Sequence, residues 1–165
     1  HYFSLDDSAC ISYAVFCLEK TQLRTPDDVA AIKQGLLDGT IDCIATDHAP
    51  HHKDEKHIEF SLAASGISGF ETAFSLAVTN LTVDADTLAR LFSVNPARII
   101  GVKGGVILEG APADITIADM DAVYTLREED IVSRGKNTPF IGWTLRGVVT
   151  HTIVDGRIVY DGGAA

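Results

Sequence analysis

Residues 41–51 read Ile41-Asp42-Cys43-Ile44-Ala45-Thr46-Asp47-His48-Ala49-Pro50-His51, and the other predicted elements can be arranged around them. This stretch begins as a short, mostly apolar run with β-branched residues and ends abruptly in Asp, His, Pro and a second His. A parallel strand that is buried on both faces reads as a nearly continuous apolar run. We therefore expect a buried strand over residues 41–46 whose end delivers Asp47 and the two histidines to a polar edge.

The composition limits the classes of protein and partner. The chain has 165 residues, 46% of them hydrophobic, which suits one ordinary domain or two small ones with a real core. Its net charge of −10 argues against a nucleic acid or an anionic membrane as partner, because phosphate binding needs a basic face. We see no apolar run near the roughly 20 residues that a membrane span needs.

Two further features bear on the setting of the protein. The three cysteines, Cys10, Cys17 and Cys43, are singly spaced with no CxxC pair, which predicts buried free thiols in a reducing, cytoplasmic compartment. The chain starts at His1 rather than at Met, so we expect a processed or truncated chain whose first half is missing.

The sequence predicts helices and one strand up to about residue 100 and mainly strands after it. Thr25, Pro26 and Gly39 delimit a helix over 25–38, with an apolar stripe of Val29, Ile32, Leu36 and Leu37. A polar loop follows the strand over 48–68. Helices are then expected over 70–80, after Asp84, and from Asn95 to Gly101, with Ile99 and Ile100 buried. Beyond these, short strands are expected at 106–108, 114–120 and 123–126, and a hairpin over 145–160 turning at Asp155-Gly156.

The residues at the end of the strand allow several chemical readings. Asp47 is a metal ligand, a general base toward metal-bound water, or a structural carboxylate. His48 is either functional or a supporting hydrogen-bonding group, whereas His51, one short turn further on, is better placed to face a substrate. His52 and His57 are expected to be solvated. Since a catalytic zinc needs three protein ligands, Asp47 cannot complete such a site alone.

The motif Ala45-Thr46-Asp47-His48-Ala49-Pro50-His51 resembles the last-strand motif of dihydroorotases in the amidohydrolase superfamily. Further segments resemble the same family in the same order, and the resemblance covers about residues 1–5 and 23–165. These segments are Leu23-Arg24-Thr25, Gly39-Thr40-Ile41-Asp42, Gly66-Ile67-Ser68-Gly69-Phe70-Glu71-Thr72-Ala73-Phe74, Val94-Asn95-Pro96-Ala97-Arg98, Gly110-Ala111-Pro112-Ala113-Asp114-Ile115 and Lys136-Asn137-Thr138-Pro139-Phe140-Ile141-Gly142-Trp143.

The resemblance implies a fold and a reaction. Residues 1–100 would be the C-terminal segment of a TIM-type (β/α)8 barrel, and residues 101–165 a small β-rich, sandwich-like domain. The parent enzyme would hold two zinc ions and interconvert dihydroorotate and carbamoyl-aspartate in pyrimidine biosynthesis. Asp47 would ligate one zinc and shuttle a proton, His51 would hydrogen-bond the substrate, and the backbone around Ser65 and Gly66 would line its pocket. The other metal ligands would lie upstream of His1, so the fragment alone is expected to be inactive.

The chain departs from the family pattern at two places. Lys20 stands where the family usually has a substrate-contacting Asn, and Ala63-Ala64-Ser65-Gly66 replaces the usual Ala-Pro-Phe-Gly. Both departures favour an alternative, a non-catalytic dihydroorotase-like partner of aspartate transcarbamoylase. Another alternative is a sibling cyclic amidase acting on allantoin or a hydantoin. A homo-oligomer is also possible, because an isolated half-barrel would leave a sheet edge open.

Overall fold

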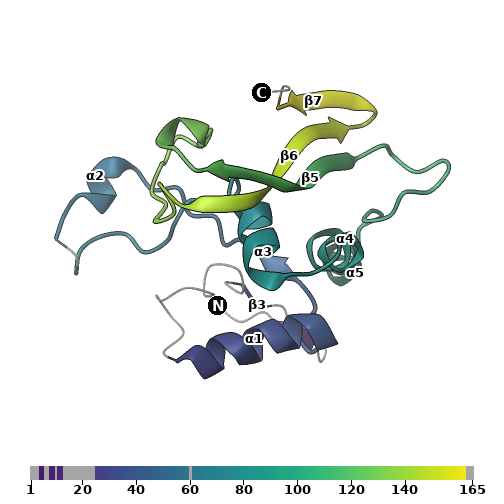
Figure 1. Ribbon diagram of the computed structural model, residues 1–165, viewed down its shortest axis with the longest axis horizontal. Helices are drawn as coiled ribbons and strands as arrows, with labels where there is room; N and C mark the ends of the chain where they lie inside the picture. The colour runs from purple at the N-terminus through teal and green to yellow at the C-terminus, as the bar shows by residue number, and fades with distance from the viewer. Residues whose placement is uncertain (1–3, 6–7, 10, 13–24, 60, 163–165) are drawn as a thin grey trace.

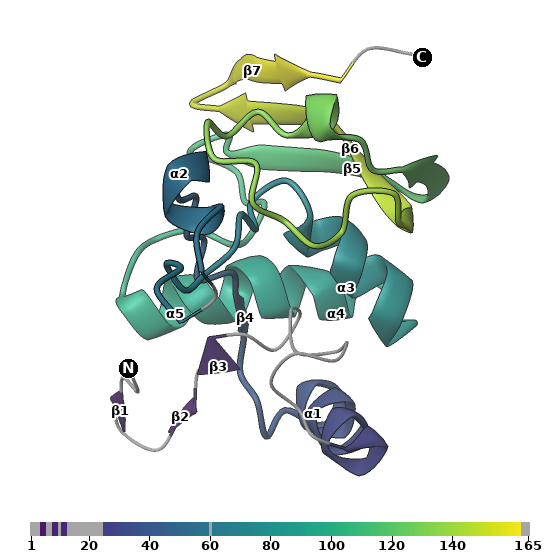
Figure 2. The same cartoon turned by 90° about the vertical axis from the view of Figure 1, so that its left-hand side faces the viewer.

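The computed structural model describes residues 4–5, 8–9, 11–12, 25–59 and 61–162. The helices and the three-stranded sheet form stacked layers (Figures 1 and 2). The sheet lies on one side, α3 (Ala73–Leu81), α4 (Ala85–Ala89) and α5 (Asn95–Ile100) lie in the middle, and α1 (Pro26–Asp38) lies on the other side. The predictions that concern Cys10, Cys17 and Lys20 fall outside the described residues. The elements in chain order are β1 (Ser4–Leu5), β2 (Ser8–Ala9), β3 (Ile11–Ser12), α1 (Pro26–Asp38), β4 (Ile44–Ala45), α2 (Lys53–Lys56), α3 (Ala73–Leu81), α4 (Ala85–Ala89), a π-helix (Arg90–Val94), α5 (Asn95–Ile100), β5 (Ile115–Thr125), a 3-10 turn (Glu128–Asp130), β6 (Thr144–Val154) and β7 (Arg157–Asp161).

Helix α1 begins and ends where the sequence predicts. Thr25 and Asp28 form a reciprocal capping box, Pro26 occupies the first turn, and Gly39 closes the helix in the left-handed conformation at φ 85°. Leu36 is fully buried, and Val29 and Ile32 pack against the core. Leu37 is 47% exposed, so its assignment to the apolar stripe is wrong; the buried face of α1 is narrower than expected.

The strand that follows α1 is shorter than predicted. Only Ile44–Ala45 pairs as β4, in parallel with β3 through the registers Ile11 to Ile44 and Ser12 to Ala45. Ile41, Cys43 and Ile44 are all buried, so the apolar run enters the core as expected. Cys43 is disulfide-bonded, which corrects the prediction that it is a free thiol.

The helices after the polar loop are more continuous than predicted. Asp84 caps α4, with its carboxylate accepting from the N–H of Thr87 at 2.9 Å. The chain then passes through the π-helix directly into α5, and the N–H of Asn95 bonds back to the carbonyl of Arg90. Asn95 is therefore inside a helical run rather than at its cap, and its side-chain amide donates to the carbonyl of Asp42 at 2.6 Å. Ile100 is 70% exposed, contrary to the prediction of burial.

The three-stranded antiparallel sheet has the order β5-β6-β7. The two strands expected over 114–126 are one strand, β5, whose register against β6 shifts between Ile117 and Ala118 and again between Asp119 and Val123. The hairpin turn at Asp155-Gly156 is confirmed, with both residues at positive φ (50° and 74°) as a type I′ turn requires. The strand predicted at 106–108 is wrong, since these residues lie in an exposed loop.

One hydrophobic core joins the sheet to the helices. Its buried members come from both the 25–100 and the 101–162 parts, among them Leu36, Leu76, Leu91, Leu126 and Leu145. The sheet lies on α3, where Gly147 at φ 87° allows the closest approach, because a Cβ there would come within 2.9 Å of Val78 Cγ2. The Ser75 hydroxyl donates to the Gly147 carbonyl at 2.5 Å. Among the described residues, no helix is long and apolar enough to cross a membrane.

Candidate functional site

Asp47 comes two residues after β4 and turns the chain out of the core. Its backbone has φ 44°, a left-handed conformation that Asp and Asn adopt more readily than most residues. The residue is exposed, and within the described part of the chain its carboxylate makes no hydrogen bond or ion pair. The Asp47 carboxylate is thus an available acceptor or metal ligand at the end of a buried strand.

His48 has a supporting role in the structure. Its Nδ1 accepts hydrogen bonds from the backbone N–H of Gly69 at 3.0 Å and of Phe70 at 3.2 Å. Acceptance at Nδ1 places the proton of the neutral ring on Nε2. The ring also stacks on Phe70, with centroids 3.8 Å apart and planes 6° from parallel. His48 therefore fixes the start of the segment that leads into α3.

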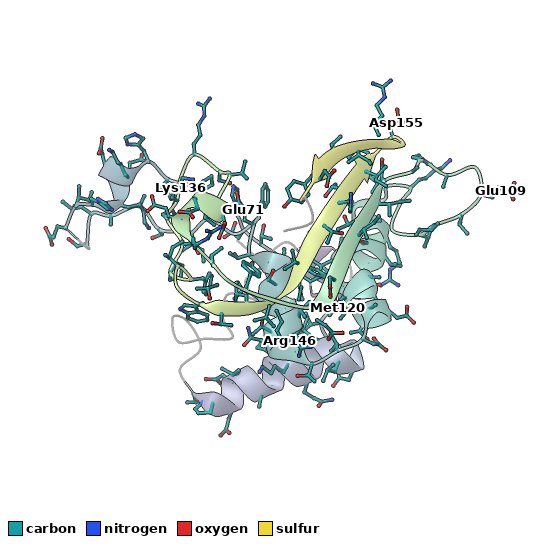
Figure 3. All side chains as sticks on the ribbon, turned by 45° about the horizontal axis from the view of Figure 1, so that its top comes forward. Glu71, Glu109, Met120, Lys136, Arg146 and Asp155 are labelled. Atoms are coloured by element: carbon teal, nitrogen blue, oxygen red, sulfur yellow. The ribbon has the colours of Figure 1, made fainter. Side chains whose placement is uncertain are left out.

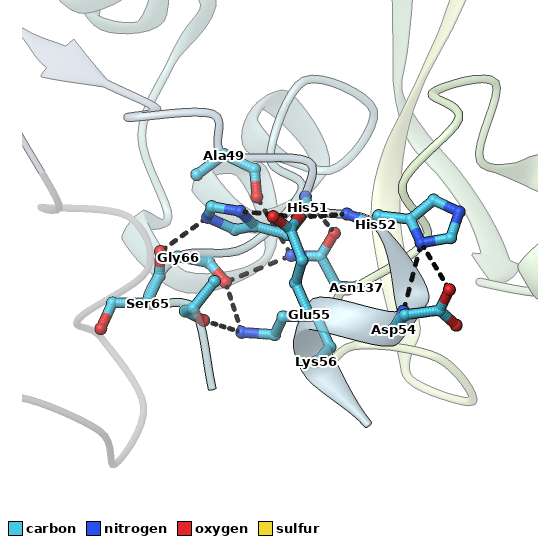
Figure 4. A network of polar contacts seen from close by, with 10 residues as sticks. Ala49, His51, His52, Asp54, Glu55, Lys56, Ser65, Gly66 and Asn137 are labelled. Carbon is cyan, nitrogen blue, oxygen red and sulfur yellow. Dashed lines mark hydrogen bonds and ion pairs between the residues drawn. The ribbon is translucent and has the colours of Figure 1, made fainter. Parts of the chain in front are cut away.

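His51, Ser65 and Gly66 lie together, although the sequence separates them (Figure 4). The Nε2–H of His51 donates to the carbonyl oxygen of Ser65 at 2.8 Å, and its Nδ1 lies 3.7 Å from Glu55 Oε2. Gly66 has φ 122°, and a Cβ there would lie 2.5 Å from Ala49 Cβ and 3.4 Å from His51 Nε2. Only glycine permits this approach.

Two side chains that the sequence analysis did not single out hold this group in place. Asn137 accepts from the N–H of His51 at 3.0 Å and donates to the carbonyls of Ala49 and Gly66 at 3.0 and 3.2 Å. Lys56 donates to the carbonyls of Ala64 at 2.6 Å and Gly66 at 3.1 Å. In the sequence, Asn137 could have been found by its place in the Lys136–Trp143 motif. Lys56 carries no sequence signal other than its place in a polar loop.

Glu71 is a third residue that the sequence analysis missed as a site candidate. Its Oε1 accepts from both the N–H and the hydroxyl of Ser133, each at 2.7 Å, while Oε2 is buried and has no partner in the described part of the chain. Burial acts to raise the pKa of Glu71, but the two bonds from Ser133 outweigh it and hold the pKa below its ordinary value. Glu71 is therefore a carboxylate held in its charged form beside the segment that His48 supports.

The two remaining histidines behave as loop residues. His52 is exposed, and its Nδ1 accepts from the N–H of Asp54 at 3.3 Å, which caps α2. His57 is exposed at the other end of α2, where its N–H bonds to the carbonyl of Lys53. The expectation that both are solvated agrees with their exposure.

The described residues do not form a complete metal centre. No group of three or more His, Cys, Asp or Glu side chains among them is arranged to hold a metal ion. Asp47 has the chemistry of one ligand and no competing partner in the described part of the chain, so it fits zinc as a single contributor. A separate pocket of about 640 Å³ lies between α5 and the 102–112 loop, and none of the predicted site residues lines it.

Residues 8–159 match the sequence profile described as the amidohydrolase family. The chain belongs to the amidohydrolase family. This amidohydrolase chain is 47% identical over 163 residues to the dihydroorotase of Geotalea daltonii, covering 97% of the chain and 38% of that protein. It is 49% identical over 167 residues to the dihydroorotase of Endomicrobium trichonymphae, covering 98% of the chain and 39% of that protein. The predicted resemblance to dihydroorotases over a partial length is confirmed; the chain spans about two fifths of these relatives.

Solved structures share the fold of this amidohydrolase segment. The L-hydantoinase (dihydropyrimidinase) of Arthrobacter aurescens superposes with a TM-score of 0.78 at 25% identity, over 86% of the chain and 33% of that enzyme. The D-hydantoinase (dihydropyrimidinase) of a Thermus species superposes with a TM-score of 0.77 at 24% identity, over 87% of the chain and 33% of that enzyme. Because the identity is this low, this likeness shows the fold alone. Both superpositions are consistent with the prediction that this chain is a segment of an amidohydrolase barrel enzyme, and they are also consistent with the small sheet of this chain.

Proposed function

We propose that this chain is the C-terminal portion of a zinc-dependent dihydroorotase that interconverts dihydroorotate and N-carbamoyl-aspartate in the cytoplasm, as part of pyrimidine biosynthesis. The observation that carries the proposal is the hydrogen bond from His51 to the carbonyl of Ser65, four positions after the exposed Asp47, whose carboxylate has no partner among the described residues. The identity of 42–49% to proteins named dihydroorotase supports the same reaction. Residues 1–100 would be the barrel segment and residues 101–165 the small β domain.

The backbone around Ser65 and Gly66 is suited to bind an anionic group of the substrate. The carbonyl of Ser65 accepts from His51, and the carbonyl of Gly66 accepts from Lys56 and Asn137. The N–H groups of both residues make no hydrogen bond within the described part of the chain. The N–H groups of Ser65 and Gly66 share peptide units with the carbonyls of Ala64 and Ser65, which accept from Lys56 and His51. Because each N–H points away from the carbonyl of its own peptide unit, the two N–H groups can donate to a substrate carboxylate.

Asp47 would both bind zinc and carry the proton. A bound zinc would supply a water of lowered pKa and polarise the amide carbonyl. The Asp47 carboxylate would accept the proton of that water at one oxygen and return it to the amide nitrogen as the ring opens. Asp47 is suited to this work because no other described residue occupies its oxygens. The remaining zinc ligands would come from parts of the complete protein beyond the described residues.

Two other functions have specific support. The hydantoinase structures that share the fold favour a sibling cyclic amidase, for which hydantoins or allantoin would be the substrates. Ser65 and Lys20, which replace the family's usual residues, favour a non-catalytic scaffold that assembles with aspartate transcarbamoylase or with its own copies. Only the first reading predicts turnover of dihydroorotate.

The decisive test uses the complete protein that contains this segment, and compares Asp47→Asn with Asp155→Asn. Both aspartates are exposed and lie at similar positive φ, 44° and 50°, so the second variant controls for the backbone change. The wild type and Asp155→Asn should turn over dihydroorotate with about two zinc ions per chain, the stoichiometry that the family resemblance implies. Asp47→Asn should lose about 10²-fold or more in kcat, as expected when a general base is removed. Turnover of hydantoin or allantoin instead, or absence of both zinc and turnover, would replace the proposal by the corresponding alternative.

A further inference from the structure

Asn137 lies where three distant segments of the chain meet. Its side chain bonds to the backbone of Ala49, His51 and Gly66, which are 88, 86 and 71 positions away in the sequence. Its own carbonyl accepts from the N–H of Ser68 at 3.0 Å. Asn137 thus connects residues 49–51, which follow β4, to residues 66–68, which lead into α3.

The backbones at this junction are in direct contact. A Cβ on Gly135 would lie 2.7 Å from the carbonyl oxygen of His51, and a Cβ on Gly66 would lie 2.5 Å from Ala49 Cβ. The Ser68 hydroxyl, which is buried, donates to the carbonyl of Gly135 at 2.6 Å. Because the segments pack this closely, a small displacement of one of them is transmitted to the others.

The orientation of the Asn137 amide is determined by its partners. One oxygen faces an N–H, and one nitrogen faces two carbonyl oxygens. A flipped amide would place its oxygen against both carbonyls and its nitrogen against an N–H, which loses all the bonds. The oxygen and the nitrogen of the side chain are therefore both engaged with backbone groups.

We propose that Asn137 is a positioning residue that sets the distance between the His51 imidazole and the backbone of Gly66. The structural part of the proposal stands on the contacts alone, and its effect on kinetics rests on the proposed dihydroorotase function. Asn137 does not touch the substrate; it holds the two groups that would.

The test compares Asn137→Asp with Asn137→Ala in the complete protein. Aspartate has nearly the same volume and keeps the acceptor for the His51 N–H, but it presents oxygen to the carbonyls of Ala49 and Gly66. If Asn137 acts through its hydrogen bonds, Asn137→Asp should raise KM for dihydroorotate by about tenfold, at least as much as Asn137→Ala, with a smaller change in kcat. If Asn137 merely fills space, Asn137→Asp should resemble the wild type and Asn137→Ala alone should be impaired, which overturns the proposal.

Asn80 provides the matched control. Its amide donates to the carbonyl of Leu76 within α3 at 2.8 Å, and among the described residues it bridges no separate segments. Asn80→Asp and Asn80→Ala should leave KM within about twofold of the wild type, since one local bond is worth little for distant geometry. A KM effect at Asn80 as large as that at Asn137 would show that the change is general destabilisation.

Amide hydrogen exchange separates failure of this inference from failure of the proposed function. The His51 N–H should exchange slowly in the wild type and in Asn137→Asp, which retain its acceptor, and faster in Asn137→Ala. This readout requires no turnover, so it holds for an inactive scaffold as well. Unchanged exchange at His51 in Asn137→Ala would overturn the inference even in an active enzyme.

Discussion

The Nε2 of His51 lies 2.8 Å from the carbonyl oxygen of Ser65, fourteen residues further along the chain. This contact closes the polar loop that follows β4 onto itself and leaves the N–H groups of Ser65 and Gly66 for other partners. The carbonyl of Gly66 in this loop accepts hydrogen bonds from Asn137, which lies far along the chain, and from Lys56, which belongs to the loop itself (Figure 4). The candidate site is therefore organised mainly by backbone positions rather than by a cluster of reactive side chains.

Gly66→Ala should impair substrate binding more than folding. The new Cβ would clash with Ala49 and impose a side chain on a backbone at φ 122°, which would push the Ser65–Gly66 segment away from His51. We expect KM for dihydroorotate in the complete protein to rise by about tenfold or more. Gly110→Ala is the control, because Gly110 also has a positive φ (80°) but open space around it. Equal effects of the two variants on KM would contradict the steric explanation.

His48→Leu should destabilise the protein, and His48→Asn should do so less. Leucine leaves the N–H groups of Gly69 and Phe70 without their acceptor, at a cost of about 1–3 kcal/mol in the free energy of unfolding. The Asn oxygen can take the place of Nδ1, although the stacking on Phe70 is lost. Urea unfolding of both variants measures the difference. Identical losses would indicate that stacking rather than hydrogen bonding is the main contribution of His48.

Glu71→Gln should flatten the dependence of stability on pH in acid. The pKa of Glu71 is held below its ordinary value of 4.5 in the folded protein, so the charged form contributes stability above that pH. In the wild type this contribution is lost as the pH falls from 4.5 through the lower folded pKa, whereas glutamine has nothing to titrate. Glu109→Gln is the control, since Glu109 is exposed at the tip of the 102–112 loop (Figure 3). Thermal midpoints between pH 3 and 7 measure the effect, and a wild-type slope in Glu71→Gln would contradict it.

Gly147→Ala should weaken the contact between the sheet and α3. The added Cβ would lie 2.9 Å from Val78 Cγ2 and 3.2 Å from Phe74 Cε1, inside the core that both parts of the chain share. We expect a loss of about 1–3 kcal/mol in the free energy of unfolding from overpacking, in addition to strain at φ 87°. Gly156→Ala at φ 74° in the open hairpin turn imposes the strain without the clash. Denaturant midpoints of the two variants should therefore differ clearly, and similar midpoints would indicate that backbone strain alone is responsible.

Much of the local structure follows from the sequence by itself. The capping box at Thr25, the glycine end of α1 and the Asp155-Gly156 turn are all set by residues within a few positions of one another, where short-range sterics and hydrogen bonds decide the conformation. The apolar run that places Asp47 just beyond a buried strand is equally local. These signals, and the motifs around them, were enough to predict the family and the candidate residues Asp47, His51, Ser65 and Gly66.

The tertiary structure alone decided which of these residues meet and which apolar residues are buried. Leu37 and Ile100 are exposed and 106–108 is no strand, because burial and pairing depend on what packs opposite, which periodicity does not state. The bonds of Asn137 to Ala49, His51 and Gly66 cross more than seventy positions of sequence. No local pattern determines such contacts, since they arise only when the core shared by helices and sheet brings the three segments together.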